Sequence, residues 1–123
     1  TVFAPVDHQS KEGQIELSRK IQLGRAAYDT FDLCAFLMAA TAMKPELVTD
    51  MLNGLYGTEL SPDYVVETGK DVIRREIAYN AAAGISAAED TVPDFIKQEK
   101  LPPFDLEWGI SDDELVSLFG DLR

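Results

Sequence analysis

Residues 29–34 contain the side chains best suited to chemistry in this sequence: two carboxylates and the only thiol. Asp29 and Asp32 are three residues apart, and Cys34 follows them at the start of the apolar run 35–40. A cysteine thiolate is a nucleophile and a soft metal ligand. Residue type alone favours a plainer interpretation, because free cysteines are among the most buried residues in proteins. If the chain does any chemistry, we expect it to pass through Cys34.

His8 is the only histidine of the chain. It has no cysteine or second histidine nearby at the spacing of a metal site. We therefore expect His8 to be a solvent-exposed loop residue.

The composition is that of one globular domain. The chain has 123 residues, of which 46% are hydrophobic. Its formal net charge of −11 repels phosphate backbones and anionic membrane surfaces, so we expect neither nucleic acid nor a membrane as a partner. A single cysteine forms no internal disulfide, and no charged leader with an apolar stretch opens the sequence, so we expect a cytoplasmic protein.

Apolar spacing predicts helices along most of the chain. A helical period is present over 14–28, 45–55 and 62–84, and the stretch 30–43 is apolar on every face. That last pattern is typical of a helix buried at the centre of a bundle. In the first helix Arg19 is expected to face solvent. Gly24 lies on the inner stripe, where either a close neighbour needs the room or the glycine is merely tolerated.

Capping residues and prolines indicate where these elements end. We expect Ser61 to cap the helix that begins at Pro62. Two pairs have the spacing of capping boxes: Ser86 with Glu89, and Ser111 with Glu114. Between the two boxes, 91–108 has three prolines and no regular period, so we expect an extended segment whose aromatic side chains are pinned to the core.

The sequence therefore predicts an all-α fold: an irregular bundle of four to six helices around a buried central helix, with a proline-rich extended C-terminal segment. We expect a single domain over 1–123. It would comprise an irregular lead-in at 1–13, the bundle at 14–84, and the extended segment with a short last helix at 85–123.

Two motifs in the same order resemble those of the tungsten-containing aldehyde ferredoxin oxidoreductase family. The hexapeptide at 29–34 resembles the family's D-x-x-G-L-C element. Further along, the series Glu76, Tyr79-Asn80, Gly84-Ile85-Ser86, Asp90 and Val92-Pro93 resembles its E-x-x-F-N, G-x-T and D-x-L-P series with the spacing kept. The stretch between the motifs is similar too, so the likeness covers about 13–93.

The resemblance implies cofactor roles for three residues and a catalytic role for none. Asp29 and Leu33 would contact a pterin, and Cys34 would be the fourth ligand of a [4Fe–4S] cluster. The complete enzyme would carry a tungsten or molybdenum bis-pterin and one such cluster, oxidise a small aldehyde to a carboxylate and pass electrons to ferredoxin. The residue types suit these roles, because a carboxylate accepts paired hydrogen bonds from an amino-pterin edge and iron prefers thiolates.

The same resemblance implies that this chain is one part of a larger oxidoreductase. A [4Fe–4S] cluster needs about four thiolates, and the chain has one cysteine. We expect the other ligands in N-terminal cofactor-binding domains upstream of Thr1. The isolated chain would then be inactive and free of cofactor, and it would expose an apolar patch near Cys34, with homodimerisation as a consequence. Asp32 stands where the family has Gly, which adds a carboxylate near the expected sites.

A second interpretation is an independent helical protein-interaction module with no cofactor, in which Cys34 belongs to the core. The reading frame upstream of Thr1 separates the two. Three further cysteines there with C-x-x-C-x-x-x-C spacing would favour the enzyme.

Overall fold

The computed structural model describes residues 7, 9–41, 44 and 46–123, and this part of the chain is predominantly helical. Its α-helices are α1 (Gln14–Thr30), α2 (Leu37–Thr41), α3 (Glu46–Tyr56), α4 (Asp63–Ala82), α5 (Asp94–Gln98) and α6 (Asp112–Ser117). Short 3₁₀ turns occupy Ala87–Glu89 and Gly120–Leu122. The all-α prediction is confirmed, and the helices expected at 14–28, 45–55 and 62–84 are each present to within two residues at either end.

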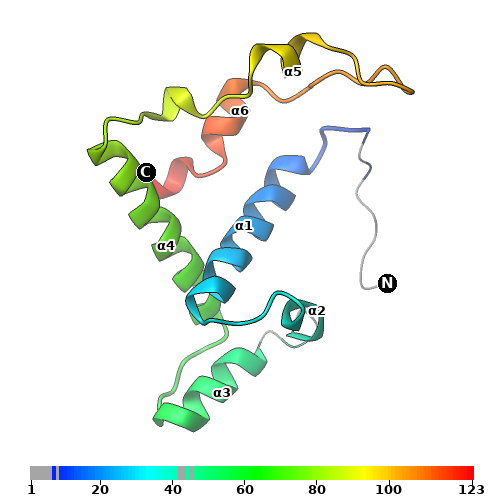
Figure 1. The fold of residues 1–123 in the computed structure, drawn as a ribbon. Coiled ribbons are helices and arrows are strands. Elements are labelled where there is room, and N and C mark those ends of the chain that lie inside the picture. Colours follow the sequence, from blue (N-terminus) through cyan, green and yellow to red (C-terminus); the bar gives the residue numbers. More distant parts are fainter. Residues whose placement is uncertain (1–6, 8, 42–43, 45) are drawn as a thin grey trace.

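The two longest helices, α1 and α4, form the frame of the molecule. They run in opposite directions, meet at one end and diverge like the arms of a V (Figure 1). At the meeting point Gly69 of α4 lies against the backbone of Leu23 in α1, and a Cβ built on Gly69 would lie 2.2 Å from the Leu23 carbonyl oxygen. Only glycine permits so close an approach. At Gly24 the nearest heavy atom, Met38 Cε, would be 4.0 Å from such a Cβ, so this glycine is merely tolerated.

The C-terminus of the chain closes the wedge between α1 and α4. Leu122 is buried with Leu23 and Ile73, and three partly buried residues pack against this cluster: Ala26, Ile77 and Phe119. Arg19 holds the turn in place, contrary to the expectation that it faces solvent. Its guanidinium donates to Asp121 Oδ2 at 2.8 Å and to the Leu118 carbonyl oxygen, and it lies 5.5 Å from the centroid of the Phe119 ring.

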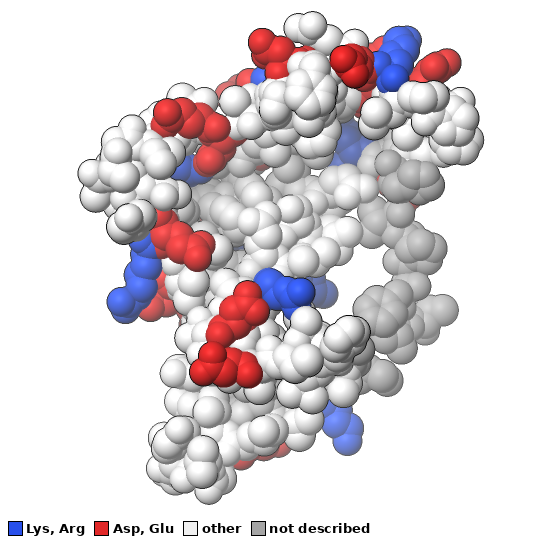
Figure 2. All heavy atoms as spheres, viewed as in Figure 1, with Lys and Arg blue, Asp and Glu red and all other residues white. Residues whose placement is uncertain are grey.

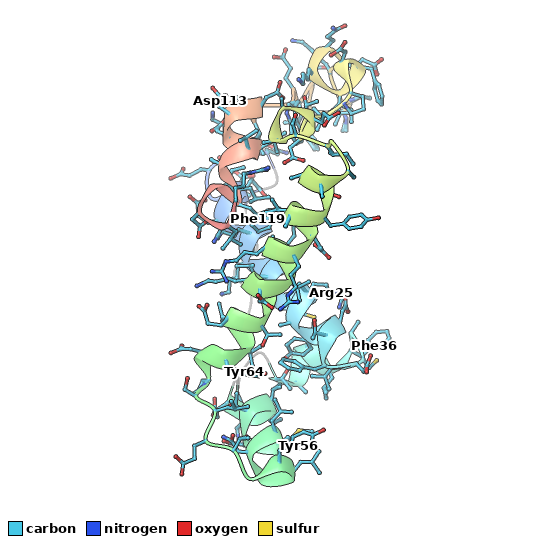
Figure 3. The ribbon with its side chains drawn as sticks, turned by 90° about the vertical axis from the view of Figure 1, so that its left-hand side faces the viewer. Arg25, Phe36, Tyr56, Tyr64, Asp113 and Phe119 are labelled. Atoms are coloured by element: carbon cyan, nitrogen blue, oxygen red, sulfur yellow. The ribbon has the colours of Figure 1, made fainter. Side chains whose placement is uncertain are left out.

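The expected central helix over 30–43 is wrong. Helix α1 ends at Thr30, a loop follows, and the five-residue α2 begins only at Leu37. Within that stretch Phe36 is 91% exposed (Figure 3). The segment is apolar on every face, and such a pattern predicts a buried helix only where other elements surround it. In the described part of the chain no set of elements covers this segment on all sides.

The C-terminal third also differs from the expectation. The segment 91–108 contains the short helix α5 and then a tight turn, closed by an antiparallel bridge between Leu101 and Leu106. Figure 1 shows this turn projecting away from α1 and α4. Phe95 and Phe104 are 58% and 62% exposed, so the prediction that these aromatics are pinned to the core is wrong.

The capping predictions are largely confirmed. Ser111 Oγ accepts from the Glu114 amide at 3.2 Å, and Glu114 Oε2 accepts from the Ser111 amide at 2.8 Å. Glu89 likewise accepts from the Ser86 amide. The helix expected to begin at Pro62 begins one residue later, at Asp63, and the Ser61 hydroxyl makes no capping bond; its carbonyl oxygen accepts from the Tyr64 amide instead.

His8 lies outside the described residues, as does most of the lead-in expected at 1–13. None of the helices in the described part of the chain combines the length and the hydrophobicity that a bilayer-crossing segment needs.

Candidate functional site

Cys34 lies in the loop 31–36, which joins α1 to α2 and is fixed at its start by a Schellman motif. The amide of Leu33 donates to the carbonyl oxygen of Tyr28, and the amide of Asp32 donates to that of Asp29. Asp32 occupies the left-handed position of the motif, with φ = 54°. The helix therefore ends here, and the chain turns out of α1 before it reaches the cysteine.

The other end of the loop is fixed through α2. The amide of Leu37 donates to the Cys34 carbonyl oxygen at 2.9 Å. Helix α2 is bonded to α1 by a buried hydrogen bond between the hydroxyls of Tyr28 and Thr41, and Arg25 Nη1 donates to Met38 Sδ at 3.2 Å. Thr41 is only 1% exposed, so this contact is shielded from water.

A third contact ties the loop to α4. The rings of Phe31 and Tyr64 lie with their centroids 6.3 Å apart, a separation typical of an aromatic pair. Tyr64 stands at the beginning of α4, close to the end at which α4 meets α1 (Figure 3). The loop that carries Cys34 is thus held against the frame at both ends and at one side.

The three predicted site residues lie on one short stretch of the chain but differ in their exposure to solvent. The side chains of Asp29 and Cys34 are exposed, and Leu33 is half-buried. Among the described residues neither the Asp29 carboxylate nor the Cys34 thiol takes part in a hydrogen bond or an ion pair within the chain. The expectation of a cysteine at a buried helix start is therefore wrong, and so is the alternative of an inert core residue.

The chain's own donor set is small. The described residues contain no group of three or more His, Cys, Asp or Glu side chains arranged to hold a metal ion. An exposed cysteine on a loop that is held at both ends is suited to act as one ligand of a larger set. Alone it cannot assemble a multi-ligand cage.

The second motif lies apart from the first. Glu76, Tyr79 and Asn80 are exposed on the later half of α4 and, with Arg75, line a shallow hollow of about 500 Å³. The loop 31–36 lies at the opposite end of α4 (Figure 1). The Asn80 carbonyl oxygen accepts from the Ile85 amide, which forms a second Schellman motif around Gly84. This part of the motif thus includes the end of a helix.

Several charged groups with lowered pKa values belong to the scaffold. A hydrogen bond from Lys97 lowers the pKa of Asp112, and one from the Ser111 amide lowers that of Glu114. A hydrogen bond from Arg19 lowers the pKa of Asp121. These carboxylates hold α6 and the C-terminal turn in place, and they lie far along the chain from the loop 31–36.

Sequence reasoning missed three residues that position this structure. Gly69 sets the approach of α4 to α1, and Thr41 anchors α2. The side-chain amide of Asn53 closes the loop after α3, because it accepts from the Leu60 amide at 2.7 Å and donates to the Leu60 carbonyl oxygen at 3.0 Å. Gly69 on the inner stripe of a predicted helix was the one available signal; the other two contacts depend on loop paths that periodicity does not reveal.

Comparison with known proteins agrees with the motifs. A family model described as aldehyde ferredoxin oxidoreductase, domains 2 and 3, matches residues 2–116, nearly the whole chain. No curated protein and no solved structure matches it. The chain therefore belongs to the aldehyde ferredoxin oxidoreductase family and corresponds to a region of its domains 2 and 3.

Proposed function

We propose that this chain is the C-terminal helical domain of an aldehyde-oxidising enzyme and that it contributes cofactor ligands from the loop 31–36. Cys34 would hold one iron of a [4Fe–4S] cluster, and Asp29 and Leu33 would contact the pterin. The observation that carries the proposal is the exposed thiol of Cys34 on a loop fixed on both sides. The other ligands would come from other domains of the same enzyme, and the isolated chain would be inactive.

The chemistry and the exposure of these residues support the proposed roles. The Asp29 carboxylate is exposed at the end of α1 and has both oxygens available for paired donors such as an amino-pterin edge. The backbone amide of Leu33 is already bonded to the Tyr28 carbonyl oxygen, so the contribution of Leu33 would come from its half-buried side chain.

When bound, the metal–pterin centre and the cluster would supply the oxidation of an aldehyde to a carboxylate and the passage of electrons to ferredoxin. The contribution of this chain would be to hold Cys34 in a fixed position. The Schellman motif turns Cys34 out of the helix, and the Tyr28–Thr41 hydrogen bond fixes the return of the loop. A ligand held in this way loses little conformational freedom when it binds.

The test uses the complete enzyme that contains this domain. Cys34→Ser should lower the iron and acid-labile sulfide found per protein, and Asp29→Asn should lower the pterin content. Asp32→Asn is the matched control, since it removes the charge of a neighbouring exposed carboxylate without an expected ligand role. Wild-type iron, sulfide and pterin contents in both of the first two variants would refute the assignment and favour a helical interaction module.

A further inference from the structure

The outer side of α3 carries an unusual row of exposed apolar side chains. Leu47, Met51 and Leu55 follow one another at intervals of four residues, which places them on one face of the helix. They are 37%, 57% and 73% exposed. The helix packs inward through Thr49, on the side opposite this row, and through Val48, which flanks it; both are buried. We call Leu47, Met51 and Leu55 the α3 face.

Two more exposed aromatic side chains lie toward the same end of the molecule as α3. Tyr56, at the end of α3, is 70% exposed, and Phe36 projects from the same end of the molecule (Figure 3). In the space-filling view the surface over α3 is mostly uncharged (Figure 2). Soluble monomers rarely leave a continuous apolar patch of more than a few hundred Å² open to water. The α3 face therefore has the character of an interface.

The negative charge beside the α3 face favours a different partner over a second copy of this chain. Glu46 and Asp50 are exposed on α3 and border the α3 face on one side. The chain as a whole has a net charge of −11. Pairing two copies through this face would bring like charges together, whereas a surface with an apolar centre and a basic border would complement it.

We propose that the α3 face docks permanently against another domain of the same enzyme, on a surface of apolar side chains bordered by Lys or Arg. The proposal rests on membership of a family of multidomain proteins, and it does not depend on the ligand roles of Asp29 and Cys34. It places a permanent contact at the end of the molecule that also carries the loop 31–36 (Figure 1).

Hydroxyl-radical footprinting tests the docking directly. Met51 and Leu55 should be modified about tenfold more slowly in the complete enzyme than in the isolated 123-residue chain. Equal modification rates in the two samples would overturn the proposal. The same measurement on the Cys34→Ser enzyme should still show Met51 protected, whatever that variant does to iron content, so this proposal and the ligand assignment fail or succeed separately.

Two further measurements test the nature of the partner. In the complete enzyme, Met51→Glu combined with Leu55→Glu should abolish protection of α3, while Tyr79→Glu, at an apolar residue 76% exposed on α4, should leave it within twofold of wild type. Far-UV circular dichroism of the isolated variants checks that they fold. Sedimentation of the isolated chain should show no dimer that buries Met51. A dimer dissociated by the Met51→Glu substitution would identify a second copy as the occupant and overturn the proposal.

Discussion

The contact between Gly69 and Leu23 gives the sharpest test of the fold. In Gly69→Ala the new Cβ would lie 2.2 Å from the Leu23 carbonyl oxygen and 2.9 Å from its carbonyl carbon, whereas ordinary van der Waals contact begins at 3.4 Å. The obstacle is backbone and cannot swing aside as a side chain would. Helix α4 must therefore move away from α1 by about 1 Å at this point.

The cost follows from what packs beside the contact. Leu23 and Ile73 are buried there, each contributing about 1.5–3 kcal/mol by burial, and a gap of 0.5–1 Å forfeits a quarter to a half of the local attraction. Residual strain in an overpacked site adds about 1–3 kcal/mol. Alanine returns about 1 kcal/mol through its better helix propensity. Together these contributions predict that Gly69→Ala destabilises the chain by about 1–5 kcal/mol.

Gly24→Ala is the matched control, since it makes the same change inside α1 with no heavy atom closer than 4.0 Å to the new Cβ. It should stabilise the chain by up to about 1 kcal/mol. Urea unfolding followed by circular dichroism at 222 nm measures both variants, and their midpoints should move in opposite directions. If Gly69→Ala raised the midpoint as much as Gly24→Ala does, the close approach of α4 to α1 would be wrong.

The remaining predictions concern the loop and the C-terminal turn. Asp32→Gly should stabilise the chain by about 0.5–1 kcal/mol, because Asp32 holds φ = 54°, and Gly84→Asp should destabilise it by a similar amount at φ = 86°; urea midpoints test both. Native Cys34 should react with an aromatic disulfide reagent as fast as it does in urea, since its side chain is exposed; a reaction that requires denaturant would contradict the loop. Arg19→Gln should lower stability at neutral pH. In the folded state the pKa of Asp121 lies below its ordinary value of 3.8, because Arg19 stabilises the charged carboxylate. The stability that this ion pair adds is therefore present above pH 3.8 and is lost as the pH falls through the folded-state pKa. In urea titrations, the difference in stability between Arg19→Gln and wild type should shrink below about pH 4.

The long helices could be predicted from the sequence because the residues that are buried in them follow the helical spacing of their apolar residues. In α4, Gly69 and Ile73 are four residues apart, and both pack against Leu23 of α1 as the period requires. The capping boxes are local devices whose partners are three residues apart, so they too are readable. Contacts that depend on the path of a loop are different. The hydroxyl contact from Tyr28 to Thr41 spans thirteen residues and has no periodic trace in the sequence.

The exposed apolar residues show a second limit of such reasoning. Phe36 lies in the stretch expected to form a buried central helix, yet it is exposed, and so are Met51 and Leu55 of α3. A hydrophobic pattern specifies that a face avoids water and leaves open which surface covers it. In a part of a larger enzyme, that surface need not belong to the same stretch of sequence.

The end of α1 within the motif at 29–34 explains why the expected helix over 30–43 does not form. In the element D-x-x-G-L-C the fourth position coincides with the left-handed residue that ends α1, and there glycine is the residue without a steric penalty. The motif therefore includes a helix stop: Asp29 and Leu33 take part in the capping hydrogen bonds, and the cysteine follows directly after them. Asp32 in place of glycine acts first on backbone energy. Aspartate is among the few residues that tolerate this conformation, so the loop keeps its path, and Cys34 keeps the exposed position on which its proposed ligand role rests.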